Sequence, residues 1–262
     1  MAEPVCRSEA PDPTFYPDEE KVPETQLHRN VGVVLEQLVR RWLAEQGVRA
    51  LVGANQFIYW VQHAPTRTVA PDVYVLPGVD PDTKIDSWKV WDTGIVPSVV
   101  VEVVGRDPWK DYEVGPARYD ELGVQELIVY DPGHAESQDR VRFQVWRRRG
   151  DDLADVARTD ARQVRSAVLG CFVREVGEGG ARLLRLATGP RGDTLVPTGE
   201  EAEHRAREAA ERERDAERSA REAAERDRDA AERERDAERG AREAAERALA
   251  RLRAELERKP SR

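Results

Sequence analysis

The stretch that decides the fold is PSVVVEVVG, residues 97–105, in which one acidic side chain, Glu102, interrupts a run of valines. The valines predict a strand over residues 98–104, because β-branched side chains favour extended backbone. A strand so apolar is expected to be covered on both faces of its sheet. Glu102 then lies among buried side chains, where an unpaired carboxylate costs several kcal/mol. A cation, hydrogen bonds or a metal ion must therefore compensate its charge.

A second acidic residue, Asp72, opens another apolar strand predicted over residues 72–76. If the two strands are neighbours in one sheet, Asp72 and Glu102 come together at its edge. Two carboxylates at one place suit a hard divalent cation such as Mg²⁺ or Mn²⁺. Such an ion polarises a phosphodiester and lowers the pKa of a bound water. The alternative is a structural pair neutralised by an arginine, for which Arg106 and Arg118 are the candidates.

The first 199 residues predict an α/β or α+β domain in which a long helix packs on a mixed sheet. The helix is expected over residues 27–47, where apolar side chains fall on one stripe and Gly47 marks the end. A second, shorter helix is expected with Pro116 in its first turn and Gly123 at its end. Strands are expected at residues 50–52, 56–62, 72–76, 98–104, 126–130 and 141–146, with closing strands at 164–173 and 181–187.

The last 63 residues have a different composition. Residues 200–262 hold 20 acidic and 18 basic side chains and no aromatic one, so this segment cannot build a core. Alanine recurs every seven residues from Ala202 to Ala244, and alanine, glutamate and arginine are strong helix formers. These repeats predict a long helix or coiled coil. Because large apolar side chains occur only near its end, a solvated single helix and a homodimer both stay open.

These contrasts divide the chain into four segments: a disordered N-terminus (1–14), a globular domain (15–199), a charged helical tail (200–259) and a disordered end (260–262). The net charge of −9 excludes a globally basic nucleic-acid binder but allows a local basic groove. Two cysteines exclude a disulfide scaffold or a zinc-cluster framework. The sequence shows no transmembrane run and no secretory signal, which predicts a cytoplasmic protein without a membrane partner.

Seven short motifs occur in a fixed order along the globular part. They are ETxLH (24–28), NxFxY (55–59), APDVxV (70–75), KxW (89–91), PxVVxEV (97–103), YxxxGVxE (119–126) and DP (131–132). This ordered set resembles the Uma-type restriction endonuclease family, a branch of the PD-(D/E)XK nuclease superfamily, over residues 15–199. The resemblance implies a restriction-endonuclease-like fold and Mg²⁺-dependent hydrolysis of phosphodiester bonds in DNA.

The resemblance also assigns roles to three acidic residues. Asp72 matches the metal-binding aspartate of the family, and Glu102 matches its second metal ligand. Glu24 matches the acidic residue that the first helix contributes to the site. The alternative for Glu24 is a first-turn glutamate favoured by the helix dipole.

One family residue, the catalytic lysine, is missing. It usually stands eight residues before the glycine that is Gly123 here, but that position holds Gly115, and Pro116 after it would shorten the helix. Lys110, on a predicted loop, is the candidate replacement, because a cation there orients the attacking water and stabilises charge on the phosphate. Arg118 could supply charge, but arginine is a poor proton acceptor.

Two functional hypotheses follow. The first is a Mg²⁺-dependent DNA endonuclease, whose active site would be degenerate if catalysis requires the lysine that Gly115 replaces. The second is a catalytically inactive nuclease fold that binds nucleic acid or protein and is displayed on the helical tail. The missing lysine favours the second hypothesis. Retention of Asp72 and Glu102 favours the first, since an abandoned metal site has no physical need for a buried acid pair.

Overall fold

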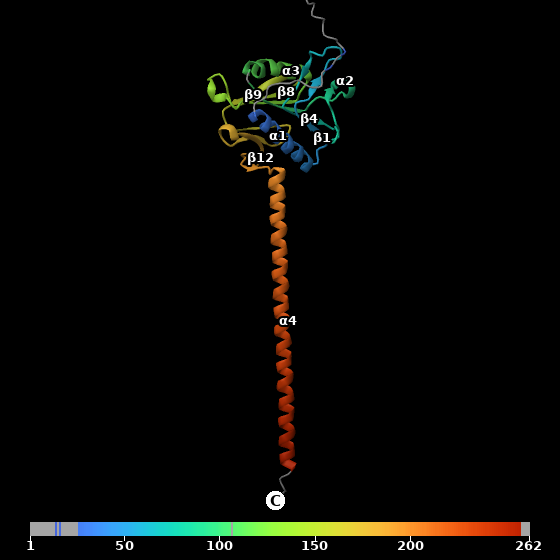
Figure 1. Cartoon of the computed structure of the whole chain (residues 1–262), viewed down its shortest axis with the longest axis vertical. Helices are drawn as coiled ribbons and strands as arrows, with labels where there is room; N and C mark the ends of the chain where they lie inside the picture. The colour runs from blue at the N-terminus through green and yellow to red at the C-terminus, as the bar shows by residue number, and fades with distance from the viewer. Residues whose placement is uncertain (1–13, 15, 17–25, 106, 258–262) are drawn as a thin grey trace, which may run out of the picture. The chain divides into compact units, whose positions relative to one another are not determined.

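The computed structural model describes residues 14, 16, 26–105 and 107–257 (Figure 1). Apart from Thr14, the two terminal segments expected to be disordered lie outside the described residues. The chain divides into two compact units, residues 1–199 and 200–262, and each is described by itself.

A six-stranded mixed sheet forms the centre of the first unit, as the sequence predicts. In spatial order its strands are β1 (Ala50–Gly53), β4 (Val73–Pro77), β6 (Val99–Val103), β7 (Glu126–Tyr130), β8 (Phe143–Arg149) and β9 (Asp152–Thr159). β6 and β7 run parallel, and every other neighbouring pair in this sheet is antiparallel. The functional consequence lies in the pairing of β4 with β6, the two strands expected to carry the acidic residues.

Helices cover both faces of this sheet, as the apolar sequence of β6 predicts. α1 (Gln26–Glu45) packs on the face that includes Val101, and α3 (Gly115–Leu122) packs on the face that includes Val100 (Figure 1). Side chains alternate along a strand, so Glu102 points to the α3 side. The acidic residue of β6 therefore faces the shorter helix.

Two smaller sheets and several short helices complete the unit. One sheet holds β3 (Thr68–Val69), β2 (Phe57–Tyr59) and β5 (Ser87–Lys89), and the other holds β10 (Gln163–Arg165), β11 (Phe172–Val176), β12 (Leu183–Thr188) and β13 (Thr194–Leu195). The short helices are α2 (Val90–Thr93), η2 (His134–Glu136) and η3 (Gly179–Ala181). β12 lies against α1, so the second sheet shares the core on that side of the central sheet.

Beyond residue 150 the structure differs from the sequence expectations. The single strand expected over residues 164–173 is two strands, β10 and β11, because the chain turns between them at Gly170, which has a left-handed φ of 71°. β9 was not expected at all. Its side chains are exposed or half-buried throughout, so no apolar run marks it, and its pairing with β8 defines it instead.

The segment before α3 corrects two further expectations. Lys110 is not on a loop, and Pro116 does not shorten the helix, because η1 (Lys110–Val114) is a π-helical turn that continues into α3. Proline has no N–H, so the carbonyl of Tyr112 cannot receive the usual bond from position 116. The N–H of Gly115 instead reaches back five residues to the Lys110 carbonyl. π-helical turns of this kind are frequent at functional sites.

The second unit is the predicted long helix, α4 (Gly199–Glu257), of 59 residues. At the usual rise it is about 90 Å long. Every side chain described from Glu203 to Ala254 is exposed. Ion pairs three or four residues apart line it, such as Arg239 with Asp236 at 2.8 Å. No helix in the described ranges is long and apolar enough to cross a membrane.

Candidate active site

The pairing of β4 with β6 places the two predicted carboxylates side by side. Val73 lies opposite Val101 in the antiparallel register, so Asp72, one residue before β4, lies opposite Glu102. The backbone N–H of Asp72 donates a long hydrogen bond of 3.4 Å to Oε2 of Glu102. Two acidic residues thirty positions apart thus meet where one strand begins and the other ends.

Both carboxylates line a cavity of about 530 Å³. Its walls come from the start of α1, the small β2–β3 sheet, the loop after β6, and the helical segment formed by η1 and α3. Its other polar and charged lining residues are His28, Asn55, Thr68, Asp107, Lys110, Asp111, Arg118 and Tyr119. The cavity therefore combines acidic groups with two cationic side chains.

Asp72 is buried and held in one orientation. Its Oδ2 accepts a hydrogen bond of 2.6 Å from the backbone N–H of Val103, and its Oδ1 lies 2.6 Å from Nε2 of His28 on α1. A carboxylate oxygen can accept two hydrogen bonds, so each keeps acceptor capacity. Sequence spacing gives no sign of the contact with His28, because it joins the first helix to a strand 44 residues later.

Glu102 is held by Tyr119 on α3, whose hydroxyl donates to its Oε1. Burial raises the pKa of the Glu102 carboxyl well above its ordinary value, and the negative charge of Asp72 raises it further. The hydrogen bond from Tyr119 opposes that shift. Burial also raises the pKa of the Tyr119 phenol well above its ordinary value, so Tyr119 stays protonated and remains a donor.

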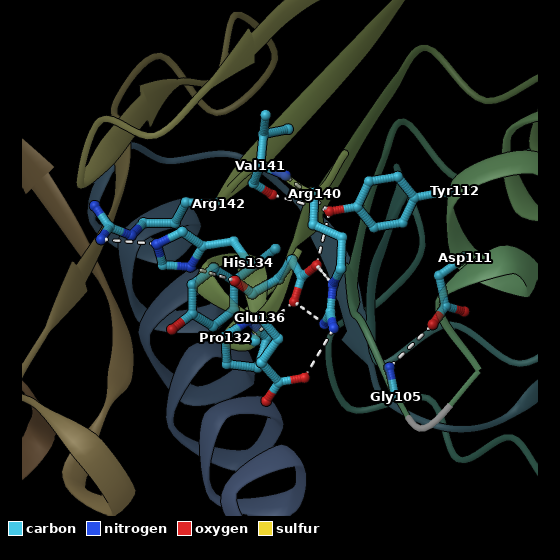
Figure 2. Close-up of polar contacts among 12 residues, drawn as sticks. Gly105, Asp111, Tyr112, Pro132, His134, Glu136, Arg140, Val141 and Arg142 are labelled. Atoms are coloured by element: carbon cyan, nitrogen blue, oxygen red, sulfur yellow. Dashed lines mark hydrogen bonds and ion pairs between the residues drawn. The ribbon is translucent and has the colours of Figure 1, made fainter. Parts of the chain in front are cut away.

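A third acidic residue, Asp111 on η1, borders the same cavity, and sequence reasoning missed it. Its carboxylate accepts a 3.0 Å hydrogen bond from the N–H of Gly105 (Figure 2). Burial raises the pKa of the Asp111 carboxyl, while Gly105 and the Lys110 ammonium oppose that shift. Asp111 belongs to none of the recognised motifs, and only the π-helical turn brings it to the cavity.

Lys110 and Gly115 both line the cavity. Lys110 is exposed at its border. At Gly115, a Cβ would meet no heavy atom closer than the Lys110 carbonyl oxygen at 3.4 Å, and its φ of −57° suits any residue. A side chain can therefore be built at position 115. Arg118 also lines the cavity and lies 3.4 Å from the Thr68 carbonyl.

A partly buried polar network anchors η1 to the end of β7. The hydroxyl of Tyr112 donates to Oδ2 of Asp131 at 2.7 Å and accepts a 3.2 Å hydrogen bond from the N–H of Val141. Arg140 binds both oxygens of Asp131, at 2.7 and 2.6 Å. Figure 2 shows the side chains of Tyr112 and Arg140 next to each other in this network. The turn that carries Lys110 and Asp111 is thus fixed from its other side.

Two sequence candidates cannot be placed, because Glu24 and Arg106 lie outside the described residues. Within the residues that the structure does describe, no group of three or more His, Cys, Asp or Glu side chains is arranged to hold a metal ion. Among the described residues, the candidate metal ligands at the cavity are therefore the two carboxylates of Asp72 and Glu102.

Comparison with known proteins finds a structural likeness and a matching family. A solved structure, the crystal structure of a putative nuclease belonging to DUF820 from Anabaena variabilis, is 12% identical, with a TM-score of 0.39, and the match covers 56% of this chain and 75% of that one. No curated protein matches this chain. The sequence pattern of the Uma2 family, described as "Putative restriction endonuclease", matches residues 16–170. Because that match spans more than half of the sequence, the chain belongs to the Uma2 family.

Proposed function

We propose that this protein is a divalent-metal-dependent endonuclease that hydrolyses phosphodiester bonds in DNA, with Asp72 and Glu102 as the ligands of Mg²⁺ or Mn²⁺. The observation that carries the proposal is the approach of these two carboxylates at one cavity. Membership of the Uma2 family, described as "Putative restriction endonuclease", supports it.

The donor set fits such an ion. The raised pKa of Glu102 reflects burial next to Asp72, and a divalent cation would remove that repulsion and keep both groups ionised. Mg²⁺ usually takes one or two carboxylates and completes its shell with waters and substrate phosphates. Two acidic side chains at an open cavity meet that need without a third.

The protein groups around the pair have separate tasks. The N–H of Val103 fixes the Asp72 carboxylate, and the Tyr119 hydroxyl fixes that of Glu102. A divalent ion held there supplies polarisation of the phosphodiester and a lowered pKa for the attacking water. Lys110, exposed at the cavity, stabilises the negative charge that develops on the phosphate.

The decisive experiment is cleavage of plasmid and single-stranded DNA in Mg²⁺ and in Mn²⁺. We expect Asp72→Asn and Glu102→Gln each to reduce cleavage by at least about 100-fold, because each removes a ligand of the ion. Glu113→Gln is the matched control, since Glu113 is an exposed acid of η1 that does not line the cavity. Equal cleavage by all four proteins would show that the activity resides elsewhere.

The absence of the family lysine at Gly115 favours a second candidate function, an inactive nuclease fold used for binding. In that case the protein cleaves neither plasmid nor single-stranded DNA in Mg²⁺ or in Mn²⁺. Calorimetric titration with Mn²⁺ then gives the same result for the wild-type protein and for Asp72→Asn. A complex that depends on α4 and survives chelation would then identify the binding role. Homodimerisation through α4 is a further proposal, tested by the mass of the chain in solution.

A further inference from the structure

Trp109 is the one aromatic side chain among the strongly exposed large hydrophobic residues of the described chain, with 66% of its surface accessible. The other five tryptophans, at positions 42, 60, 88, 91 and 146, are buried or half-buried. An indole gains more from burial than almost any other side chain, so leaving one in water sacrifices stability. Tryptophan is enriched at binding interfaces, where a partner covers the apolar face of the ring.

Its position points to the ligand. Trp109 lines the same cavity as Asp72 and Glu102, immediately before η1. The next residue is Lys110, which is also exposed and also lines the cavity. A flat aromatic face, a positive charge and an acidic pair therefore border one space. These are the groups that a base, its phosphate and a divalent ion would require.

We propose that Trp109 stacks on a nucleobase next to the scissile phosphodiester, so that the site takes single-stranded or locally unpaired DNA. The inference rests on the proposed nuclease function of the same cavity. Inside a regular duplex both faces of each base are covered by its neighbours, and a side chain can stack only on a base that has left the helix. A stacking tryptophan thus selects the unpaired state.

The charge of the chain agrees with this choice. A net charge of −9 gives little general attraction for the phosphates of a duplex, which supply most of the non-specific affinity in basic DNA-binding proteins. Stacking on an aromatic side chain does not depend on that attraction and tolerates any base sequence. Trp109 would then provide a large share of the affinity for the strand.

The test is binding of a fluorescent dT12 strand, followed by anisotropy in Mg²⁺, with Glu102→Gln as the parent protein so that the strand stays intact. Trp109→Ala is expected to raise the Kd about 5- to 150-fold, the loss usual for one stacked base. Trp109→Phe keeps an aromatic face and should restore most of the affinity. Val48→Ala, which trims an exposed apolar side chain outside the cavity, is the matched control and should change nothing.

Binding of two further nucleic acids, an abasic strand and a duplex, shows which part of the strand Trp109 contacts. A twelve-residue abasic strand has the same backbone without bases, and a twelve-base-pair duplex has no free base face, so Trp109→Ala should leave the weak binding of both unchanged. Quenching by acrylamide gives an independent readout, because Trp109 is the most exposed tryptophan. dT12 should protect the quenchable fraction in the parent, and the abasic strand should not.

The outcomes separate this inference from the proposed function. If Trp109→Ala binds dT12 as tightly as the parent does, the stacking site is wrong, even when the wild-type protein cleaves DNA. If dT12 binding depends on Trp109 while the wild-type protein cleaves nothing, the stacking site stands and the hydrolytic function is wrong. Equal dependence of abasic-strand binding on Trp109 would overturn the role of the base.

Discussion

At the scale of single residues, the acidic pair could be predicted and its surroundings could not. Asp72 and Glu102 stand out because a carboxylate within or beside an apolar strand needs a physical reason. The contacts of His28 and Tyr119 with them join elements far apart in sequence, so no spacing rule reveals these partners. Asp111 is hidden for a different reason, since its place at the cavity depends on one extra residue in a helical turn.

Because Gly115 has no side chain, adding a lysine at this position should increase the rate of DNA cleavage. Gly115→Lys should raise the rate of DNA cleavage on the order of 100-fold, because it adds a cation that assists proton transfer at the position where the resemblance implies a lysine. The site accepts a side chain, with 3.4 Å to the nearest atom. Cleavage is measured under single-turnover conditions. Gly115→Met has similar bulk without charge, and an equal gain there would exclude the cation as the cause.

At the scale of elements, the spacing of apolar residues predicts those helices and strands that depend on local sequence. The bounds of α1, the strands β4, β6 and β7, and the end of α3 at Gly123 follow from apolar patterns and turn residues. Two features were missed because they depend on tertiary context. β9 exists through its pairing with β8, and η1 is a π-helical turn that a polar network anchors to the end of β7. Sequence patterns carry no signal for either.

The network that holds η1 should affect catalysis as well as stability. Tyr112→Phe removes the hydroxyl that contacts Asp131 and should lower the free energy of unfolding by about 1–2 kcal/mol. Because η1 carries Lys110 and Asp111, cleavage should fall as well. Urea denaturation and cleavage assays measure the two effects.

A matched control separates them. Tyr130→Phe removes a different hydroxyl, which is buried and donates to Glu175 at 2.8 Å, and Tyr130 does not line the cavity. It should cost similar stability and leave the cleavage rate unchanged. A parallel loss of activity in both variants would mean that the rate follows global stability and that Tyr112 has no positioning role.

At the scale of the whole molecule, the apolar core lies before Gly199, and the described part of α4 beyond Ala202 has only exposed side chains. The composition of the tail already predicted a helix unable to build a core. Whether α4 associates with a second copy could not be predicted, because its alanine-rich face lacks the large side chains that decide the matter.

Removal of residues 206–262 should therefore leave the folding of the globular domain intact. We expect its melting temperature to stay within a few degrees of that of the full chain, since every side chain described between residues 206 and 254 is exposed. Removal from residue 193 onward is the control. It deletes β13 and the buried Val196, and it should lower the melting temperature clearly. Differential scanning calorimetry compares the three proteins.

The length of α4 has a practical consequence for any measurement of size. A helix of about 90 Å adds far more hydrodynamic drag than its mass would in a compact fold. On a gel-filtration column calibrated with spherical standards, a single 29.6 kDa chain will elute early, where a compact dimer is expected. Light scattering measures molar mass independently of hydrodynamic drag. It can therefore distinguish one chain from two where gel filtration cannot.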